Sequence, residues 1–145
     1  MHYQQSKTAD PYIIRLDRGE KVVSSLTAFC LEHDIKAATI SAIGAVDQLT
    51  CGYYDLASKK YHFTDYTEPL EVVSLTGYVT EKDDAPHLHL HGVFSDTKNL
   101  ARGGHVVEMT VGVVLEVTLT PLDKPIVRIH DDCTGLALMT FTELS

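Results

Sequence analysis

One segment near the N-terminus has apolar side chains at the spacing of an α-helix. Five of them recur every three or four residues and form a single stripe: Val22, Val23, Leu26, Phe29 and Cys30. The preceding Asp17-Arg18-Gly19-Glu20 resembles a capping box, with Asp17 as N-cap and Glu20 turning back toward it. The pattern predicts a helix over about residues 20–33, after a first strand over residues 12–16.

From residue 37 onward the pattern changes to short runs rich in β-branched and aromatic residues, separated by brief polar or glycine-containing turns. The predicted strands span residues 37–46, 48–55, 60–66, 71–80, 87–95, 111–120, 126–130 and 136–142. Antiparallel pairing is favoured, because parallel strands would each need a long crossover. We therefore expect one α+β domain over residues 1–145, with one main N-terminal helix packed on a mostly antiparallel mixed sheet.

Histidines alternate with leucines in one of these predicted strands. His87, His89 and His91 are separated by Leu88 and Leu90. Because successive strand residues point to opposite faces, the three imidazoles would share one face. Neutral imidazole nitrogens suit zinc, copper, iron or nickel, so the run is a candidate metal site. A hydrated sheet face, or histidines bonded to backbone carbonyls, is the alternative interpretation.

A further histidine, His105, comes directly after Gly103-Gly104. We expect residues 95–104 to form the longest irregular segment, with the glycine pair making a tight turn that returns His105 to the strand. Three protein ligands with one position left for water are typical of an open zinc site. The remaining histidines have no partner at ligand spacing and are expected at surface or capping positions: His2, His33, His62 and His130.

The charge balance narrows the classes of partner. The chain has 12 Lys and Arg against 20 Asp and Glu, a net charge of −8, and no run of basic residues. This composition argues against DNA binding through neutralised phosphates. There is no apolar stretch of about 18 residues and no basic segment leading into an apolar one at the start, so we expect no membrane span, no secretory signal and a cytoplasmic location. Cys30, Cys51 and Cys133 are odd in number and widely spaced, which favours free thiols.

Six short motifs follow one another in a distinctive order. They are Arg15-Leu16-Asp17-Arg18-Gly19-Glu20, Ile43-Gly44-Ala45-Val46, Gly52-Tyr53-Tyr54-Asp55, Glu71-Val72-Val73-Ser74-Leu75-Thr76-Gly77, His89-Leu90-His91-Gly92-Val93-Phe94-Ser95-Asp96 and Gly103-Gly104-His105. In order and spacing they resemble the PPC domain, the plant and prokaryote conserved domain, over nearly the whole chain. The resemblance implies a homotrimer. It also implies a fold similar to that of acetolactate decarboxylase, a zinc enzyme that holds its metal with a His-X-His pair and a downstream histidine.

Carried onto this sequence, the resemblance implies a divalent metal, most simply zinc, held by His89, His91 and His105. His87 is the extra histidine of the run. It is left open as a fourth ligand, a residue that supports a ligand, or a solvated edge residue.

Two classes of function fit these observations. The plant domains that this one resembles are joined to AT-hooks, short basic segments built around Arg-Gly-Arg-Pro, and act as nuclear DNA binders. This sequence has no such segment, so a DNA-binding role rests on the resemblance alone. We expect a metal-binding regulatory module whose metal is retained for structure or for sensing a small-molecule ligand, with DNA or protein partners supplied elsewhere.

The alternative is a zinc-dependent enzyme, of the lyase or decarboxylase type, that acts on a small carbonyl acid. Such an enzyme needs an acid or base near the metal, and Glu71, Glu108 and Glu116 are the candidates. Arg102 is a candidate for holding a substrate carboxylate. Each of the four is also compatible with an ordinary solvent-facing position, so no catalytic residue is assigned.

Overall fold

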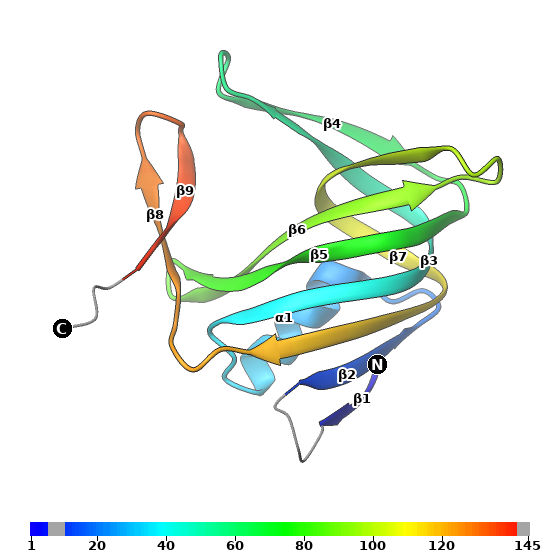
Figure 1. Cartoon of the computed structure of the whole chain (residues 1–145), viewed down its shortest axis with the longest axis horizontal. Coiled ribbons are helices and arrows are strands. Elements are labelled where there is room, and N and C mark those ends of the chain that lie inside the picture. Colours follow the sequence, from blue (N-terminus) through cyan, green and yellow to red (C-terminus); the bar gives the residue numbers. More distant parts are fainter. Residues whose placement is uncertain (6–10, 142–145) are drawn as a thin grey trace.

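The computed structural model describes residues 1–5 and 11–141, which form one helix and nine strands in a single sheet (Figure 1). The elements are β1 (His2–Gln5), β2 (Tyr12–Asp17), α1 (Val22–Glu32), β3 (Ala38–Asp55), β4 (Lys60–Tyr66), β5 (Leu70–Lys82), β6 (Ala85–Ser95), β7 (Ala101–Pro121), β8 (Val127–Asp131) and β9 (Leu136–Thr140). The β5–β8 pair is parallel and the other strand pairs are antiparallel, which confirms the α+β class with a mixed, mostly antiparallel sheet. Within these described ranges, no helix has the length and apolar character needed to cross a membrane.

Four of the strands close into a ring, because β3 pairs with β5, β5 with β6, β6 with β7, and β7 with β3. The ring depends on the length of β7, which has 21 residues. Its first residues lie beside β6, and the remainder runs along β3 and β2. β3 is also long, and its second half forms a hairpin with β4 while it stays paired with β7 as far as Gly52 (Figure 1).

The long strands correct several predicted boundaries. Predicted strands 37–46 and 48–55 are one strand, because β3 passes through its bulges without a turn. The predicted strand 111–120 is only the second half of β7. β1 was not predicted, since its four residues show no hydrophobic alternation. Residue 142, the predicted end of the last strand, lies outside the described residues.

The predicted loop before His105 is shorter than expected, over residues 96–100, and the predicted glycine turn was wrong. Ala101 already belongs to β7, and Gly103 and Gly104 lie inside that strand, paired with Val93 and Gly92 of β6. A Cβ atom on Gly104 would lie 2.6 Å from the carbonyl oxygen of Gly52 in β3. The glycine pair therefore permits neighbouring backbones to approach closely and does not reverse the chain.

α1 packs on one face of the sheet and fills the core with Val22, Leu26 and Phe29 (Figure 1). The helix prediction is confirmed to within two residues, but its N-terminus differs from the predicted capping box. The Glu20 carboxylate does accept a hydrogen bond from the Asp17 backbone N–H (2.7 Å), yet the helix begins five residues after Asp17.

The first turn of α1 is capped from β7. The Glu108 carboxylate accepts hydrogen bonds from the backbone N–H groups of Val23 (2.8 Å) and Ser24 (3.1 Å). A carboxylate at this position satisfies free N–H groups and interacts favourably with the positive end of the helix dipole. Glu108 thus joins the helix to the sheet.

The three cysteines are free thiols, as predicted. Cys30 and Cys51 are buried, and Cys133 is exposed. Burial raises the pKa of the Cys30 thiol to about 12, so this group is an inert part of the core.

Candidate metal centre

β6 sends its histidines and leucines to opposite faces, as the alternation predicts. Leu88 and Leu90 are buried in the core, whereas His89 is half-buried and His91 is exposed on the other face. In the β6–β7 register, His91 lies directly opposite His105. Strand pairing therefore places His105 beside the His-X-His pair.

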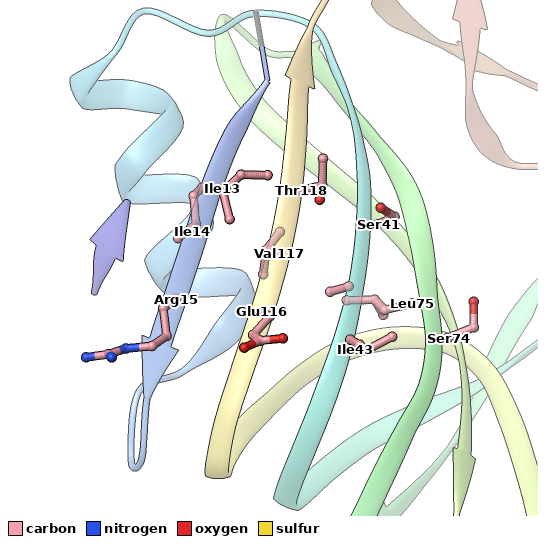
Figure 2. Close-up of a pocket in the computed structure, with 11 residues that line it drawn as sticks. Ile13, Ile14, Arg15, Ser41, Ile43, Ser74, Leu75, Glu116, Val117 and Thr118 are labelled. Atoms are coloured by element: carbon pink, nitrogen blue, oxygen red, sulfur yellow. The ribbon is translucent and has the colours of Figure 1, made fainter. Parts of the chain in front are cut away.

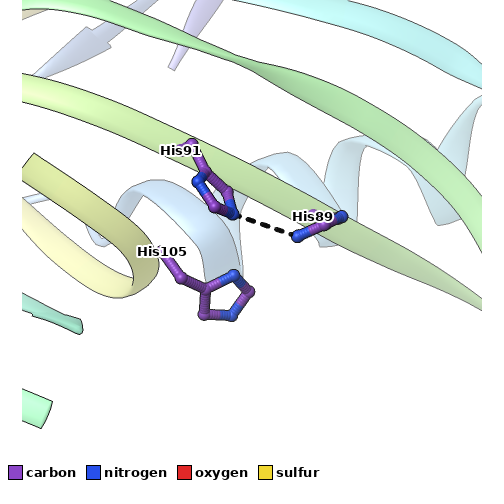
Figure 3. A group of neighbouring side chains, drawn as sticks. All are labelled: His89, His91 and His105. Carbon is purple, nitrogen blue, oxygen red and sulfur yellow. Dashed lines mark hydrogen bonds between the residues drawn. The ribbon is translucent and has the colours of Figure 1, made fainter. Parts of the chain in front are cut away.

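The three imidazoles that were predicted as ligands converge (Figure 3). Their ring centroids are 5.1 Å apart for His89 and His91, 5.1 Å for His89 and His105, and 5.4 Å for His91 and His105. One nitrogen from each ring lies within 4.8 Å of the others. The Nε2 atoms of His89 and His91 are 3.2 Å apart. Two nitrogens on one tetrahedral zinc, each at about 2.0–2.1 Å, stand roughly 3.3–3.4 Å apart, so this spacing fits a shared ion.

The chemical state of these rings also suits a metal. Nδ1 of His105 is buried and has no hydrogen-bond partner among the described residues. Burial, reinforced by the charge of Arg128, lowers the pKa of His89 to about 4. Burial likewise lowers the pKa of His105. Both rings are therefore neutral at physiological pH, which is the form that binds a metal.

The three histidines lie in a pocket of about 640 Å³ whose walls come from two hairpins. The β3–β4 hairpin supplies Tyr53, Tyr54 and Tyr61, and the β8–β9 hairpin supplies Arg128 and residues 136–138. In Figure 1 the two hairpins extend beyond the body of the sheet. His87 lines the same pocket but does not belong to the group of converging nitrogens.

Arg128 is a pocket residue that the sequence analysis missed. Its guanidinium donates hydrogen bonds to Thr80 Oγ1 (2.9 Å), to the carbonyl oxygen of Ala137 (2.9 Å) and to Nδ1 of His89 (3.0 Å). Arginine can only donate, so Nδ1 of His89 is the acceptor in this structure. A metal bound at Nε2 would place the ring proton on Nδ1 and would therefore release this hydrogen bond from Arg128. Without metal, the proton of neutral His89 is on Nε2 and is donated to His91, along the dashed line in Figure 3. A lone arginine in a short strand gives no sequence signal of this contact.

None of the candidate acids, bases and anchors named from the sequence lines the pocket. Glu108 caps α1, and Glu116 lies in a separate groove on the face of the sheet away from α1 (Figure 2). Glu71 is exposed near the start of β5. Arg102 forms ion pairs with Asp96 and Glu68, so its guanidinium holds the segment before β7.

The other histidines are mostly where they were expected. His33 is the C-cap residue of α1, and His62 and His130 are exposed. The side chain of His2 lies outside the described residues.

Comparison with known proteins gives a consistent set of matches. A family model described as the Plants and Prokaryotes Conserved (PCC) domain matches residues 3–123. No curated protein matches the chain. A "putative DNA binding protein" from Bacteroides thetaiotaomicron is 27% identical, with 96% of this chain and 97% of that chain covered and a TM-score of 0.90.

Two archaeal structures are similar over almost their whole length. A "metal-containing protein" from Archaeoglobus fulgidus is 34% identical, with 97% of both chains covered and a TM-score of 0.84. A "plant- and prokaryote-conserved (PPC) protein" from Pyrococcus horikoshii is 28% identical, with 99% of this chain and 97% of that chain covered and a TM-score of 0.85. The expected likeness to the acetolactate decarboxylase fold is confirmed: the Bacillus subtilis enzyme is 13% identical, with 87% of this chain and 58% of that chain covered and a TM-score of 0.57.

We expect the metal-free protein to lose stability as the pH falls from about 6.5 to about 4. In this window the unfolded chain binds a proton at His89 that the folded state excludes, so the free energy of unfolding decreases; His105 and His87, whose pKa values are also lowered by burial, act in the same direction. Denaturant unfolding in the presence of a chelator measures the slope. His89→Gln should flatten it in this window only, and an unchanged slope would contradict the burial of a neutral ring.

Proposed function

Since this chain belongs to the Plants and Prokaryotes Conserved (PCC) domain family, whose model matches residues 3–123, we propose that it is a metal-binding regulatory protein that senses a small molecule. In this proposal His89, His91 and His105 hold one divalent cation. The observation that supports it best is the convergence of three imidazoles on one pocket of about 640 Å³. A cation with three protein ligands keeps a coordination position for water or a ligand.

Zinc is the first choice of metal because the donors are three neutral imidazole nitrogens without a thiolate or carboxylate. The similar archaeal structure described as a "metal-containing protein" adds support at the level of the family. When bound, the cation would polarise an oxygen atom of a ligand.

Ligand sensing is favoured over catalysis by what the pocket lacks. No aspartate or glutamate of the described chain lines it, so a metal-dependent lyase would have no carboxylate as general acid or base. The proton donors or acceptors that line it, besides the three candidate ligands and Arg128, are Tyr53, Tyr54, Tyr61, Lys82 and His87. Burial raises the pKa of Tyr61 and lowers that of His87. The enzyme that acts on a small carbonyl acid therefore stays the second candidate.

Family membership also supports a DNA-binding role, as in the structure described as a "putative DNA binding protein". For this chain the charge balance opposes direct binding. With 12 basic against 20 acidic residues, few counterions would be released from DNA phosphates. We propose that any regulatory role of this chain depends on partners other than DNA.

We also propose a homotrimer, on the strength of the family resemblance. A groove of about 780 Å³ lies on the sheet face away from α1 and offers a surface for subunit contact (Figure 2). Two of its apolar side chains, Ile13 and Ile43, are 52% and 58% exposed. Apolar residues grouped on an open sheet face are typical of an interaction surface.

We propose the cytoplasm as its location. The buried free thiols of Cys30 and Cys51 suit a compartment in which cysteines stay reduced.

We expect one metal ion per chain after dialysis against metal-free buffer, measured by elemental analysis. His89→Ala, His91→Ala and His105→Ala should each weaken metal binding by roughly 100-fold or more, since loss of a group that merely supports a ligand already costs 10–100-fold. His87→Ala is the matched control, because His87 lies on the same face of the same strand and lines the same pocket. Full metal content in all three variants, or none in the wild type, would remove the proposed centre.

We expect no salt-dependent, submicromolar binding of this chain to duplex DNA at physiological ionic strength. Fluorescence anisotropy with labelled duplexes, repeated at low and high salt, measures it. A submicromolar affinity that falls steeply with salt would show that the net charge of −8 is a poor guide and restore DNA as a direct partner.

We expect sedimentation equilibrium at micromolar concentration to give three times the 16.0 kDa mass of one chain. Ile43→Lys should dissociate the trimer, because it places a charge on the exposed sheet face. Leu56→Lys is the control, since Leu56 is 59% exposed in the turn after β3. A 16 kDa wild-type species would refute the trimer, and a trimeric Ile43→Lys variant would move the interface to another surface.

A further inference from the structure

The pocket that holds the three histidines has an unbalanced positive charge. Arg128 and Lys82 both line it, and no acidic residue of the described chain does. The ion pairs formed within residues 1–5 and 11–141 do not include Arg128. Burial lowers the pKa of the Arg128 guanidinium from its usual range, because desolvation disfavours the charged form. This local charge contrasts with the net charge of −8 of the chain.

Arg128 is fixed by hydrogen bonds and still has N–H groups that are free to donate. Three of its five N–H groups donate to Thr80, Ala137 and His89. The other two have no partner within the described part of the chain, although the side chain is half-buried. A fixed, half-buried guanidinium with two free donors is suited to bind an anion.

The position of Arg128 ties this anion site to the metal centre. The Nη2 atom of Arg128 lies 3.0 Å from Nδ1 of His89. An anion placed between the open coordination position of a cation and this guanidinium would have a positive charge on each side. Arg128 belongs to β8, which lies beyond residues 3–123 that the family model matches. The C-terminal hairpin therefore adds a basic side chain to the pocket that the matched segment does not contain.

The remaining walls of the pocket favour an anion with an apolar body. Tyr53, Tyr54 and Tyr61 form one wall, and Leu136 and Leu138 form the other. A volume of about 640 Å³ is in the range of small-molecule sites and is larger than an inorganic anion needs. The planar fork of a guanidinium matches a carboxylate in a bidentate manner.

We propose that this pocket binds a small carboxylic acid with an apolar body, its carboxylate joining the metal ion to Arg128. The inference rests on the proposed metal centre and names the class of ligand that the centre would sense. It assigns to Arg128 the role that the sequence analysis considered for Arg102, whose guanidinium is occupied by Asp96 and Glu68.

The test is calorimetric titration of the full-length, zinc-loaded protein with benzoate. Its neutral isostere benzamide and inorganic phosphate are titrated in parallel. Benzoate should bind at least about tenfold more tightly than benzamide, since it gains the charge-assisted hydrogen bonds. It should also bind more tightly than phosphate, because only benzoate fills the apolar walls. Zinc-free protein should bind benzoate at least about tenfold more weakly, since the cation is the second partner of the carboxylate.

Variants separate a direct role of Arg128 from support of the hairpin. Arg128→Gln should weaken benzoate binding about tenfold or more. Arg128→Lys loses the hydrogen bonds to Ala137 and Thr80 but keeps the positive charge. Because this charge attracts the carboxylate, the lysine variant should bind benzoate better than the glutamine variant. Arg18→Gln is the control, because it removes one positive charge from an exposed arginine in the turn before α1, outside the pocket, and it should bind benzoate within about twofold of the wild type.

Each failure has a distinct meaning. Zinc content is measured first, and a wild type without zinc refutes the metal centre itself. If zinc is bound but benzoate is not, or phosphate binds more tightly than benzoate, only the carboxylate proposal is overturned. It is also overturned if Arg128→Gln binds benzoate like the wild type, if Arg128→Lys binds it no better than Arg128→Gln, or if zinc does not change the affinity.

Discussion

The structure depends on the close approach of β7 to both β3 and β6, which closes the ring of strands. β7 pairs with β6 through its first residues and with β3 along most of its length, so it must bend while both ladders stay hydrogen-bonded. Gly104 makes this possible at the site, because any side chain there would collide with the backbone of Gly52. Gly44, with a φ of +149°, does the same at a bulge of β3, against the backbone of Val114. The positions of the core, the helix and the histidines all follow from this closure.

Ring closure places the three candidate ligands on paired strands, and the C-terminal hairpin supplies another wall of their pocket. His89, His91 and His105 project from adjacent ladders of the ring, where backbone pairing fixes their spacing. Arg128 and the leucines of β9 come from a short hairpin that joins the sheet through β8. The ligands of a cation need a fixed spacing, which paired strands provide. The division between strands and hairpin therefore matches the proposed division between metal site and ligand site.

The distribution of charge follows a similar division. The chain is acidic overall, yet the pocket contains only neutral and basic groups. Acidic side chains are used elsewhere: Glu108 caps the helix, and Asp96 with Glu68 holds Arg102. Excluding carboxylates from the pocket leaves its positive groups without an internal partner. An electropositive pocket in an acidic protein selects anions locally without making the whole surface attractive to nucleic acid.

The sequence by itself determined the features that depend on local periodicity. The spacing of Leu26 and Phe29 identified α1, and the alternation of His89 and Leu90 identified the two faces of β6, because helix and strand periods are properties of the backbone alone. Only the tertiary structure decided how distant segments meet. The register of β7 against β6, and not a turn at Gly103-Gly104, brings His105 to His91. The capping of α1 by Glu108 spans 85 residues, and the contact of Arg128 with His89 spans 39. These pairings are set by ring closure and side-chain packing, which no local pattern in the sequence encodes.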